Sequence, residues 1–141
     1  MTKLLSINGI DVVQKDFQQI LIRGDGKDQF NQIVNKETSL YPPSKNLEIK
    51  INDKYIFAKN SFDQWTLVYL IEQNYREVLN LISNININDE ILASDYSYGQ
   101  VYFEISGKNR NEFLNKLTQF DLRKKKFQDF SMAQTLIARV D

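Results

Sequence analysis

The side chains that most often carry out catalysis or bind transition metals are missing from this chain. Its 141 residues include no histidine and no cysteine. The composition therefore excludes thiol nucleophiles, disulfides and the usual transition-metal ligands, together with the side chain that most often transfers protons near neutral pH. Carboxylates remain for acid–base chemistry or for a hard cation such as Mg²⁺, but no pair of them lies in a recognisable motif. We expect no catalytic residue and no metal ligand in this chain.

Glycine-rich phosphate loops are absent as well. Neither G-x-G-x-x-G nor G-x-x-x-x-G-K-[ST] occurs in the sequence, so nucleotide binding by a known loop is unsupported. Gly24 instead follows an expected strand. We expect it to supply a left-handed turn, with the charges of Arg23 and Asp25 paired across it.

One segment, 96–103, resembles an RNA-binding motif. It reads Y-S-Y-G-Q-V-Y-F, close to the consensus K/R-G-F/Y-G/A-F-V-x-F/Y, whose aromatic rings stack bases on an open sheet face. However, Gln100 occupies the inner aromatic position and the leading basic residue is missing. The chain also carries 18 basic and 18 acidic residues, so it lacks the net charge that drives phosphate binding. An ordinary strand with a glycine turn is the favoured interpretation.

Several charged or aromatic residues are candidates for a protein interface. The basic run 123–126 could contact phosphate or an acidic partner, although a solvated connection is the favoured interpretation. Trp65 could be a core anchor with its indole N–H hydrogen-bonded, which we favour, or a contact at a subunit interface. On chemistry alone, the candidate interface residues are Arg23, Asp63, Trp65, Arg123, Lys124, Lys125 and Lys126.

Hydrophobic periodicity defines the elements that must position these residues. Between Trp65 and Ile71, apolar side chains occur at both odd- and even-numbered positions, so they would point to both faces of a strand. This is typical of a central strand covered on both faces. The strands at 91–97 and 100–106 are expected to join closely around Tyr98-Gly99. The full set is strands over 17–23, 47–51, 55–59, 65–71, 91–97, 100–106 and 135–140, and helices around 30–34, 75–85 and 113–117.

The order of these elements predicts an α+β fold with two ferredoxin-like (split βαβ), antiparallel-sheet lobes. From Trp65 onward the order is strand, helix, strand, strand, helix, strand, which is a complete βαββαβ unit over 63–141. The strand, helix and hairpin of 17–60 form a shortened version of the same unit. We expect the two lobes to make one compact unit over 1–141. The chain stops within or just after its last expected strand, where a few further residues would be expected.

Composition and hydropathy indicate the class of protein. Hydrophobic residues make up 42% and aromatic residues 12% of the chain, enough to fill a core. The longest apolar run, 67–71, is far shorter than the roughly 20 residues that span a bilayer. The N-terminus lacks the apolar stretch of a signal peptide. We therefore expect a cytoplasmic protein whose partners include neither nucleic acid nor a membrane.

Five segments occur in order along nearly the whole chain, and together they resemble one family. Their spacing is similar to that of the gamma subunit family of heterotetrameric sarcosine oxidase. The patterns typical of that family are, in order along the chain, L-x-L-R-G-D, a Leu-Pro…Pro breaker, P-D-E-W-L-L, D-x-S-x-x-R-x-x-L-x-L-S-G and a C-terminal L-A-K-G-C-x-x-D-L…F…A-Q-T-x-L-A-x-V. Two departures are Phe62, where proline is usual, and Leu117-Thr118, where the family has Gly-Cys. The matching segments are 20–25, 40–43, 62–67, 95–107 and 113–140.

This resemblance implies a noncatalytic subunit. In such complexes a large alpha subunit binds NAD and tetrahydrofolate, a beta subunit carries the flavin site, and a small delta subunit binds zinc. FAD, FMN, NAD, tetrahydrofolate and zinc are therefore expected in partner subunits and none in this chain. The complex oxidises sarcosine to glycine, with hydrogen peroxide and a one-carbon unit that is released as formaldehyde or passed to folate. The gamma subunit would pack against the large subunit, and the cofactors would supply the chemistry.

Two other functions remain open. The Asp-Ser and Ser-Gly segments are shared, more distantly, by folate-dependent aminomethyltransferases, so a free-standing folate-binding protein is one alternative. The sequence has no counterpart of their catalytic aspartate motif and is less than half their usual size. The other alternative is an RNA-recognition-like binding module.

Overall fold

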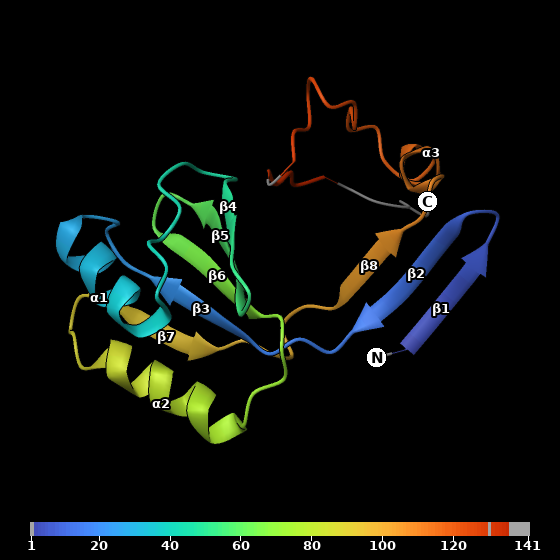
Figure 1. Cartoon of the computed structure of the whole chain (residues 1–141). Coiled ribbons are helices and arrows are strands. Elements are labelled where there is room, and N and C mark those ends of the chain that lie inside the picture. Colours follow the sequence, from blue (N-terminus) through green and yellow to red (C-terminus); the bar gives the residue numbers. More distant parts are fainter. Residues whose placement is uncertain (1, 130, 136–141) are drawn as a thin grey trace. The chain divides into compact units, whose positions relative to one another are not determined.

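The computed structural model describes residues 2–129 and 131–135 and divides into two compact units (Figure 1). One unit is Phe17–Gln100. The other combines Met1–Asp16 with Val101–Asp141, so the chain crosses between the units twice. Each unit has its own antiparallel sheet.

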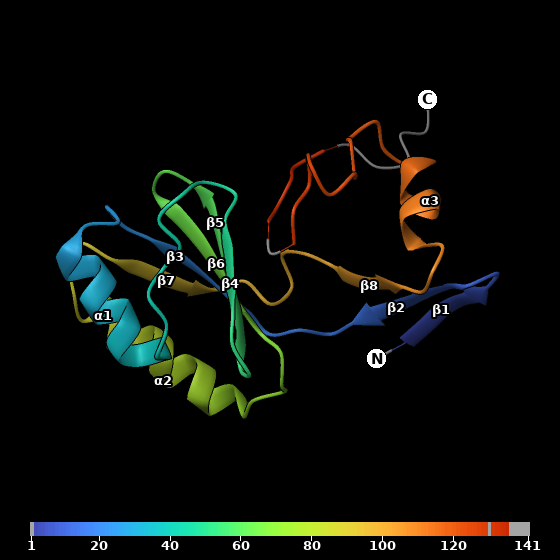
Figure 2. The same ribbon diagram turned by 45° about the horizontal axis from the view of Figure 1, so that its top comes forward.

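The Phe17–Gln100 unit contains a five-stranded sheet in the order β4-β5-β6-β3-β7. When the edge strand β4 is set aside, the elements follow one another along the chain as β3-α1-β5-β6-α2-β7. In the sheet, the four strands lie in the order β5-β6-β3-β7. This combination is a complete ferredoxin-like βαββαβ unit. Both helices lie on the same side of the sheet (Figures 1 and 2). The strands are β3 (Gln19–Arg23), β4 (Ile49–Ile51), β5 (Tyr55–Ser61), β6 (Gln64–Tyr69) and β7 (Leu92–Asp95), and the helices are α1 (Asp28–Thr38) and α2 (Tyr75–Asn86).

The core of this unit lies between the sheet and the two helices. Its side chains alternate along each strand, as Ile20 and Ile22 do on β3, and meet Phe30 of α1 and Val78 of α2. Every residue from Trp65 to Tyr69 is at most 5% exposed, which confirms the predicted central strand with both faces covered.

The second unit contains a three-stranded sheet in the order β1-β2-β8, with helix α3 next to β2. The strands are β1 (Thr2–Ile7), β2 (Ile10–Lys15) and β8 (Tyr102–Ser106), and the helix is α3 (Arg110–Asn115). Asn8 and Gly9 connect β1 to β2 with φ values of 51° and 74°. Two consecutive positive φ angles define the type I′ hairpin turn, for which Asn-Gly is a strong sequence signal. The sequence-based prediction assigned no element to this hairpin.

The α+β class and the two antiparallel sheets are confirmed, but the chain divides at different places from those expected. The complete βαββαβ unit lies within residues 17–100 and not within 63–141. The reason is β3, which inserts between β6 and β7: Ile22 pairs with Trp65 on one side and with Ala93 on the other. Hydrophobic alternation predicts a strand, but it does not say which strands become its neighbours.

The predicted pairing of the strands around Tyr98-Gly99 is also wrong. β7 pairs with β3, and β8 pairs with β2, in different sheets. The aromatic segment 96–103 is therefore split between a turn and β8, and it does not form the third strand of a βαββαβ unit, where the RNA-binding motif would need it. Of the predicted strand over 135–140, Thr135 has no regular structure and the rest lies outside the described residues. No described helix is both long enough and apolar enough to cross a bilayer.

Candidate functional site

Trp65 is a buried anchor that joins four segments of the five-stranded unit. Its side chain is 1% exposed, and its Nε1–H donates a hydrogen bond to the Pro43 carbonyl oxygen at 2.9 Å. Its ring centroid lies 4.6 Å from that of Phe30 on α1, and the Lys59 Nζ atom lies 4.9 Å from the ring. The interpretation of Trp65 as a core residue with its indole N–H hydrogen-bonded is confirmed. Trp65 therefore lies beneath the surface, not on it.

Arg23 and Asp63 meet at the same end of the sheet as Trp65. The Gly24 N–H donates to the Asp63 carbonyl oxygen at 3.1 Å, which joins the end of β3 to the turn between β5 and β6. The Arg23 Nη2 atom donates to Gln64 Oε1 at 3.1 Å. Asp25 Oδ1 accepts the Lys27 N–H at 2.9 Å. Among the described ion pairs there is none between Arg23 and Asp25, so that expected pair is not formed.

The expected left-handed turn at Gly24 is also absent. The positive φ angle in this segment belongs to Gly26, at 69°, and not to Gly24. Gly24 has a different reason to be glycine: a Cβ atom there would lie 2.3 Å from the ring of Phe30. The buried Phe30 ring therefore occupies the space that any larger residue at position 24 would need.

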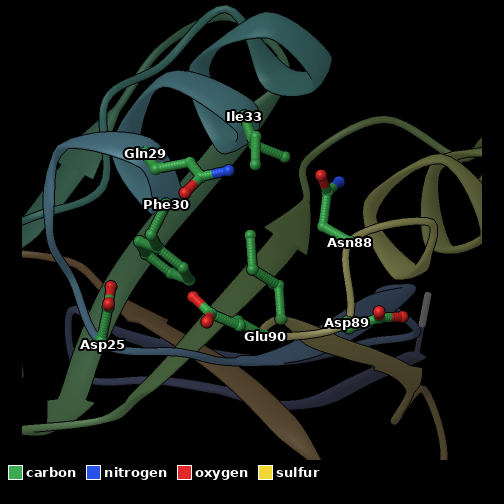
Figure 3. Close-up of a pocket in the computed structure, with 8 residues that line it drawn as sticks. Asp25, Gln29, Phe30, Ile33, Asn88, Asp89 and Glu90 are labelled. Atoms are coloured by element: carbon green, nitrogen blue, oxygen red, sulfur yellow. The ribbon is translucent and has the colours of Figure 1, made fainter.

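Four carboxylates surround two adjoining depressions at this end of the unit, and we call the region the acidic hollow. It consists of Asp25, Asp63, Asp89 and Glu90. The deeper depression has a volume of about 190 Å³ and is drawn in Figure 3, while the shallower one adds Arg23 and Asp63 to its lining. The residues lining the deeper depression are Asp25, Gln29, Phe30, Ile33, Asn88, Asp89, Glu90 and Ile91.

Three segments of the chain build the hollow. Asp25 follows β3, Phe30 and Ile33 lie on the first turns of α1, and residues 88–91 connect α2 to β7 (Figure 3). Phe30 and Ile91 are 2% and 7% exposed, so the floor is apolar while the rim is charged. A groove of this kind suits an amphipathic group, such as a basic side chain with an apolar stem.

The chemistry of the hollow is electrostatic. Within the described part of the chain, none of the four carboxylates forms an ion pair, and no three acidic residues come close enough together to hold a metal ion. The hollow therefore gathers four carboxylates against one basic side chain, Arg23, in a chain of zero formal net charge. Such a patch attracts cationic groups.

The basic run 123–126 lies in the other unit and is exposed, outside regular helix or strand. Arg123 is already engaged: its Nη2 and Nε atoms donate to the Asp121 carboxylate at 2.6 and 2.9 Å. These hydrogen bonds from Arg123 lower the pKa of Asp121 to about 2. The side chains of Lys124, Lys125 and Lys126 are exposed, as in the solvated connection favoured from the sequence.

Asp95 organises a turn at the opposite end of β7. Its Oδ1 atom accepts hydrogen bonds from the Ser97 N–H and Oγ–H at 3.0 and 2.7 Å, and its Oδ2 atom accepts one from the Tyr75 hydroxyl at 3.1 Å. The Ser97 Oγ atom in turn accepts the Gln19 N–H at 3.2 Å. Burial raises the pKa of Asp95, but the hydrogen bonds from Ser97 and Tyr75 outweigh it, so the net shift of this pKa is downward.

We expect Asp95→Asn to lower the free energy of unfolding at pH 7 by about 1 kcal/mol, because an amide accepts these hydrogen bonds less well than a carboxylate. The pKa of Asp95 is lower in the folded than in the unfolded chain. The stability that this carboxylate contributes is therefore fully present above its pKa in the unfolded chain, and it is lost as the pH falls through its pKa in the folded chain. Urea denaturation at pH 7 and at about pH 3 should therefore show that the wild type and Asp95→Asn differ less in their free energy of unfolding at the lower pH. Asp89→Asn, at an exposed carboxylate, is the control. A wild-type-like Asp95→Asn at pH 7 would contradict the expectation.

Sequence reasoning identified only part of the hollow. Arg23 and Asp63 were among the candidate interface residues, whereas Asp89 and Glu90 were missed. The available signal was local, because two acidic residues stand together just before the strand predicted over 91–97. Their proximity to Asp25 depends on β7 lying beside β3, which the sequence pattern did not predict.

Comparison with known proteins reveals a fold relationship. No protein-family model matches the sequence, and no curated protein matches it significantly. Among solved structures, the chain is similar to a chain of the heterotetrameric sarcosine oxidase from Corynebacterium sp. U-96, determined in complex with pyrrole 2-carboxylate. The TM-score is 0.73 at 14% sequence identity, over 89% of this chain and 64% of that chain. The two proteins share a fold, and this chain covers less than two thirds of the length of the other.

Proposed function

We propose that this chain is a noncatalytic, gamma-type subunit of a heterotetrameric sarcosine oxidase or of a related N-methyl amino acid demethylase. It supports assembly of a complex that oxidatively demethylates sarcosine to glycine, with hydrogen peroxide and a one-carbon unit as the other products. The observation that carries the proposal is the fold likeness to a chain of that enzyme over 89% of this sequence. The order of the sequence landmarks supports the gamma-type assignment.

The chemistry of the chain supports a structural role. The Ser97 hydroxyl donates to the Asp95 carboxylate, whose lowered pKa makes it a weak base, and accepts from the Gln19 main chain, so it holds a turn together. The sequence offers no histidine or cysteine elsewhere. In the proposed complex, the flavin, NAD, folate and zinc chemistry belongs to the alpha, beta and delta subunits.

Affinity purification of the tagged chain from its native cell, under gentle conditions, tests the proposal. We expect larger flavin-bearing subunits in the eluate, identified by mass spectrometry and by visible absorbance. Recovery of the tagged chain alone would contradict it. Micromolar binding of tetrahydrofolate by the isolated chain in calorimetry would instead favour a free-standing folate-binding protein.

Within this proposal, we expect the acidic hollow to contact basic side chains of a larger subunit. Asp89→Lys combined with Glu90→Lys should weaken co-purification by about an order of magnitude, because it replaces attraction by repulsion at the rim. Asp53→Lys with Glu72→Lys, which reverses the same number of charges outside the hollow, is the control. Quantitative mass spectrometry of the eluates measures the effect, and equal recovery from both double variants would exclude the hollow as the contact surface.

A further inference from the structure

The segment 120–127, which we call the basic turn, is held together by its own contacts although it forms neither helix nor strand (Figures 1 and 2). The N–H groups of Lys126 and Phe127 both donate to the Arg123 carbonyl oxygen at 2.8 Å. The ring of Phe127 meets the ring of Phe120 edge-on, with 5.4 Å between the two centroids. The two ends of the turn are therefore closed against each other.

The four basic side chains of this turn have different roles. The Arg123 guanidinium group is used within the turn, because it donates to both oxygens of the Asp121 carboxylate. Lys124, Lys125 and Lys126 are exposed, and within the described part of the chain none of them forms an ion pair. The turn therefore presents three adjacent ammonium groups to a partner.

The charges of the chain are also unevenly divided between its two units. The Phe17–Gln100 unit contains more acidic than basic residues, whereas the unit that carries the basic turn contains more basic than acidic residues. The three lysines are therefore part of a unit with a net positive charge. A field of this sign steers negatively charged surfaces toward the turn.

The contacts within the basic turn also favour one class of anionic partner. Because its backbone is already ordered, the turn loses less conformational entropy on binding than a flexible basic tail would. Single-stranded nucleic acid is bound by basic groups together with aromatic rings on which bases stack. Here the rings of Phe120 and Phe127 are half-buried and pack against each other. Lysines without a stacking ring suit the carboxylates of an acidic protein surface.

We propose that the basic turn docks on an acidic surface of a larger, flavin-bearing subunit. This inference rests on the proposed function and adds a second contact, opposite in sign to the one expected of the acidic hollow. A partner that presents acidic groups to the turn and basic groups to the hollow is attracted in one orientation only, because the reversed orientation places like charges together.

Charge reversal tests this contact. Lys124→Glu combined with Lys125→Glu should lower the recovery of flavin-bearing proteins from an extract of the native cell about tenfold. Lys108→Glu combined with Lys116→Glu is the matched control, because both lysines are exposed in the same unit and the change in net charge is identical. It should behave like the wild type. Equal loss from the two double variants would overturn the proposal, since only the net charge of the unit would then matter.

The salt dependence of the recovery gives a second measurement. Exposed charges are screened more strongly as the ionic strength rises, so the wild type should recover less flavin-bearing protein at about 0.3 M than at about 0.05 M salt. The residual recovery by the Lys124→Glu, Lys125→Glu variant should change less over the same range. A wild-type recovery that is independent of salt would overturn an ionic contact.

The failure of this inference can be distinguished from the failure of the proposed function. If the wild type recovers no flavin-bearing protein even at low salt, both are wrong. If the wild type and the Lys124→Glu, Lys125→Glu variant recover it equally, only the docking of the basic turn is wrong. Ribonuclease-sensitive RNA that co-purifies with the wild type and is lost from this variant would overturn the acidic protein partner in favour of nucleic acid.

Discussion

Replacing Trp65 by alanine is expected to lower the free energy of unfolding by about 3–5 kcal/mol, the range for large aromatic residues in a core. The substitution removes a fully buried ring that contacts Phe30 and lies beneath the Lys59 ammonium group. It also leaves the buried Pro43 carbonyl oxygen without its indole donor. Urea denaturation followed by far-UV circular dichroism measures the effect, since the variant lacks the chain's single tryptophan.

Phe62→Ala is the matched control for this prediction. Phe62 lies three residues before Trp65 but is 76% exposed, so its removal should change the stability by no more than about 0.5 kcal/mol. A Trp65→Ala variant within about 1 kcal/mol of the wild type would mean that Trp65 does not anchor the core.

Gly24→Ala is expected to destabilise the chain by about 1–3 kcal/mol, the usual cost of overpacking a core. The new methyl group would lie 2.3 Å from the ring of Phe30, which is 2% exposed and cannot move aside freely. The φ angle of Gly24 is outside the left-handed region, so the cost is steric rather than conformational. Chemical denaturation of the single variant measures it.

A double-mutant cycle identifies the cause of this cost. In a Phe30→Leu background the smaller side chain makes room for the methyl group, so the additional effect of Gly24→Ala should fall well below its value in the wild type. Additive effects would show that the Phe30 ring is not what restricts position 24.

The parts of the fold that could be predicted from sequence are those decided by neighbouring residues. The apolar run from Trp65 indicated a strand covered on both faces, and the stripe from Tyr75 indicated α2. The hairpin turn at Asn52 was also predictable, because asparagine favours turns by bonding to nearby main-chain groups. Here the Asn52 Oδ1 atom accepts hydrogen bonds from the Lys54 and Tyr55 N–H groups within the same turn. The Asn8-Gly9 turn carried an equally local signal, but the strands beside it have a mixed pattern that conceals it.

What could not be predicted depends on residues far apart in the chain. The position of β3 between β6 and β7 is decided by how well three buried strand faces fit together, and alternation along one strand carries no information about its neighbours. The same limit applies to the acidic hollow. Asp25 and Glu90 come together only because β7 pairs with β3, whereas Arg23 and Asp63 could be suspected from their chemistry alone.

We have proposed that this chain works as a noncatalytic part of a larger flavin-containing assembly. The most direct measurement is size-exclusion chromatography of an extract of the native cell, with the untagged chain followed by mass spectrometry and the flavin by its absorbance. We expect the chain to elute together with flavin-bearing proteins, far above its own mass of 16.6 kDa. Elution at the mass of one or two copies, separate from any flavin, would contradict it.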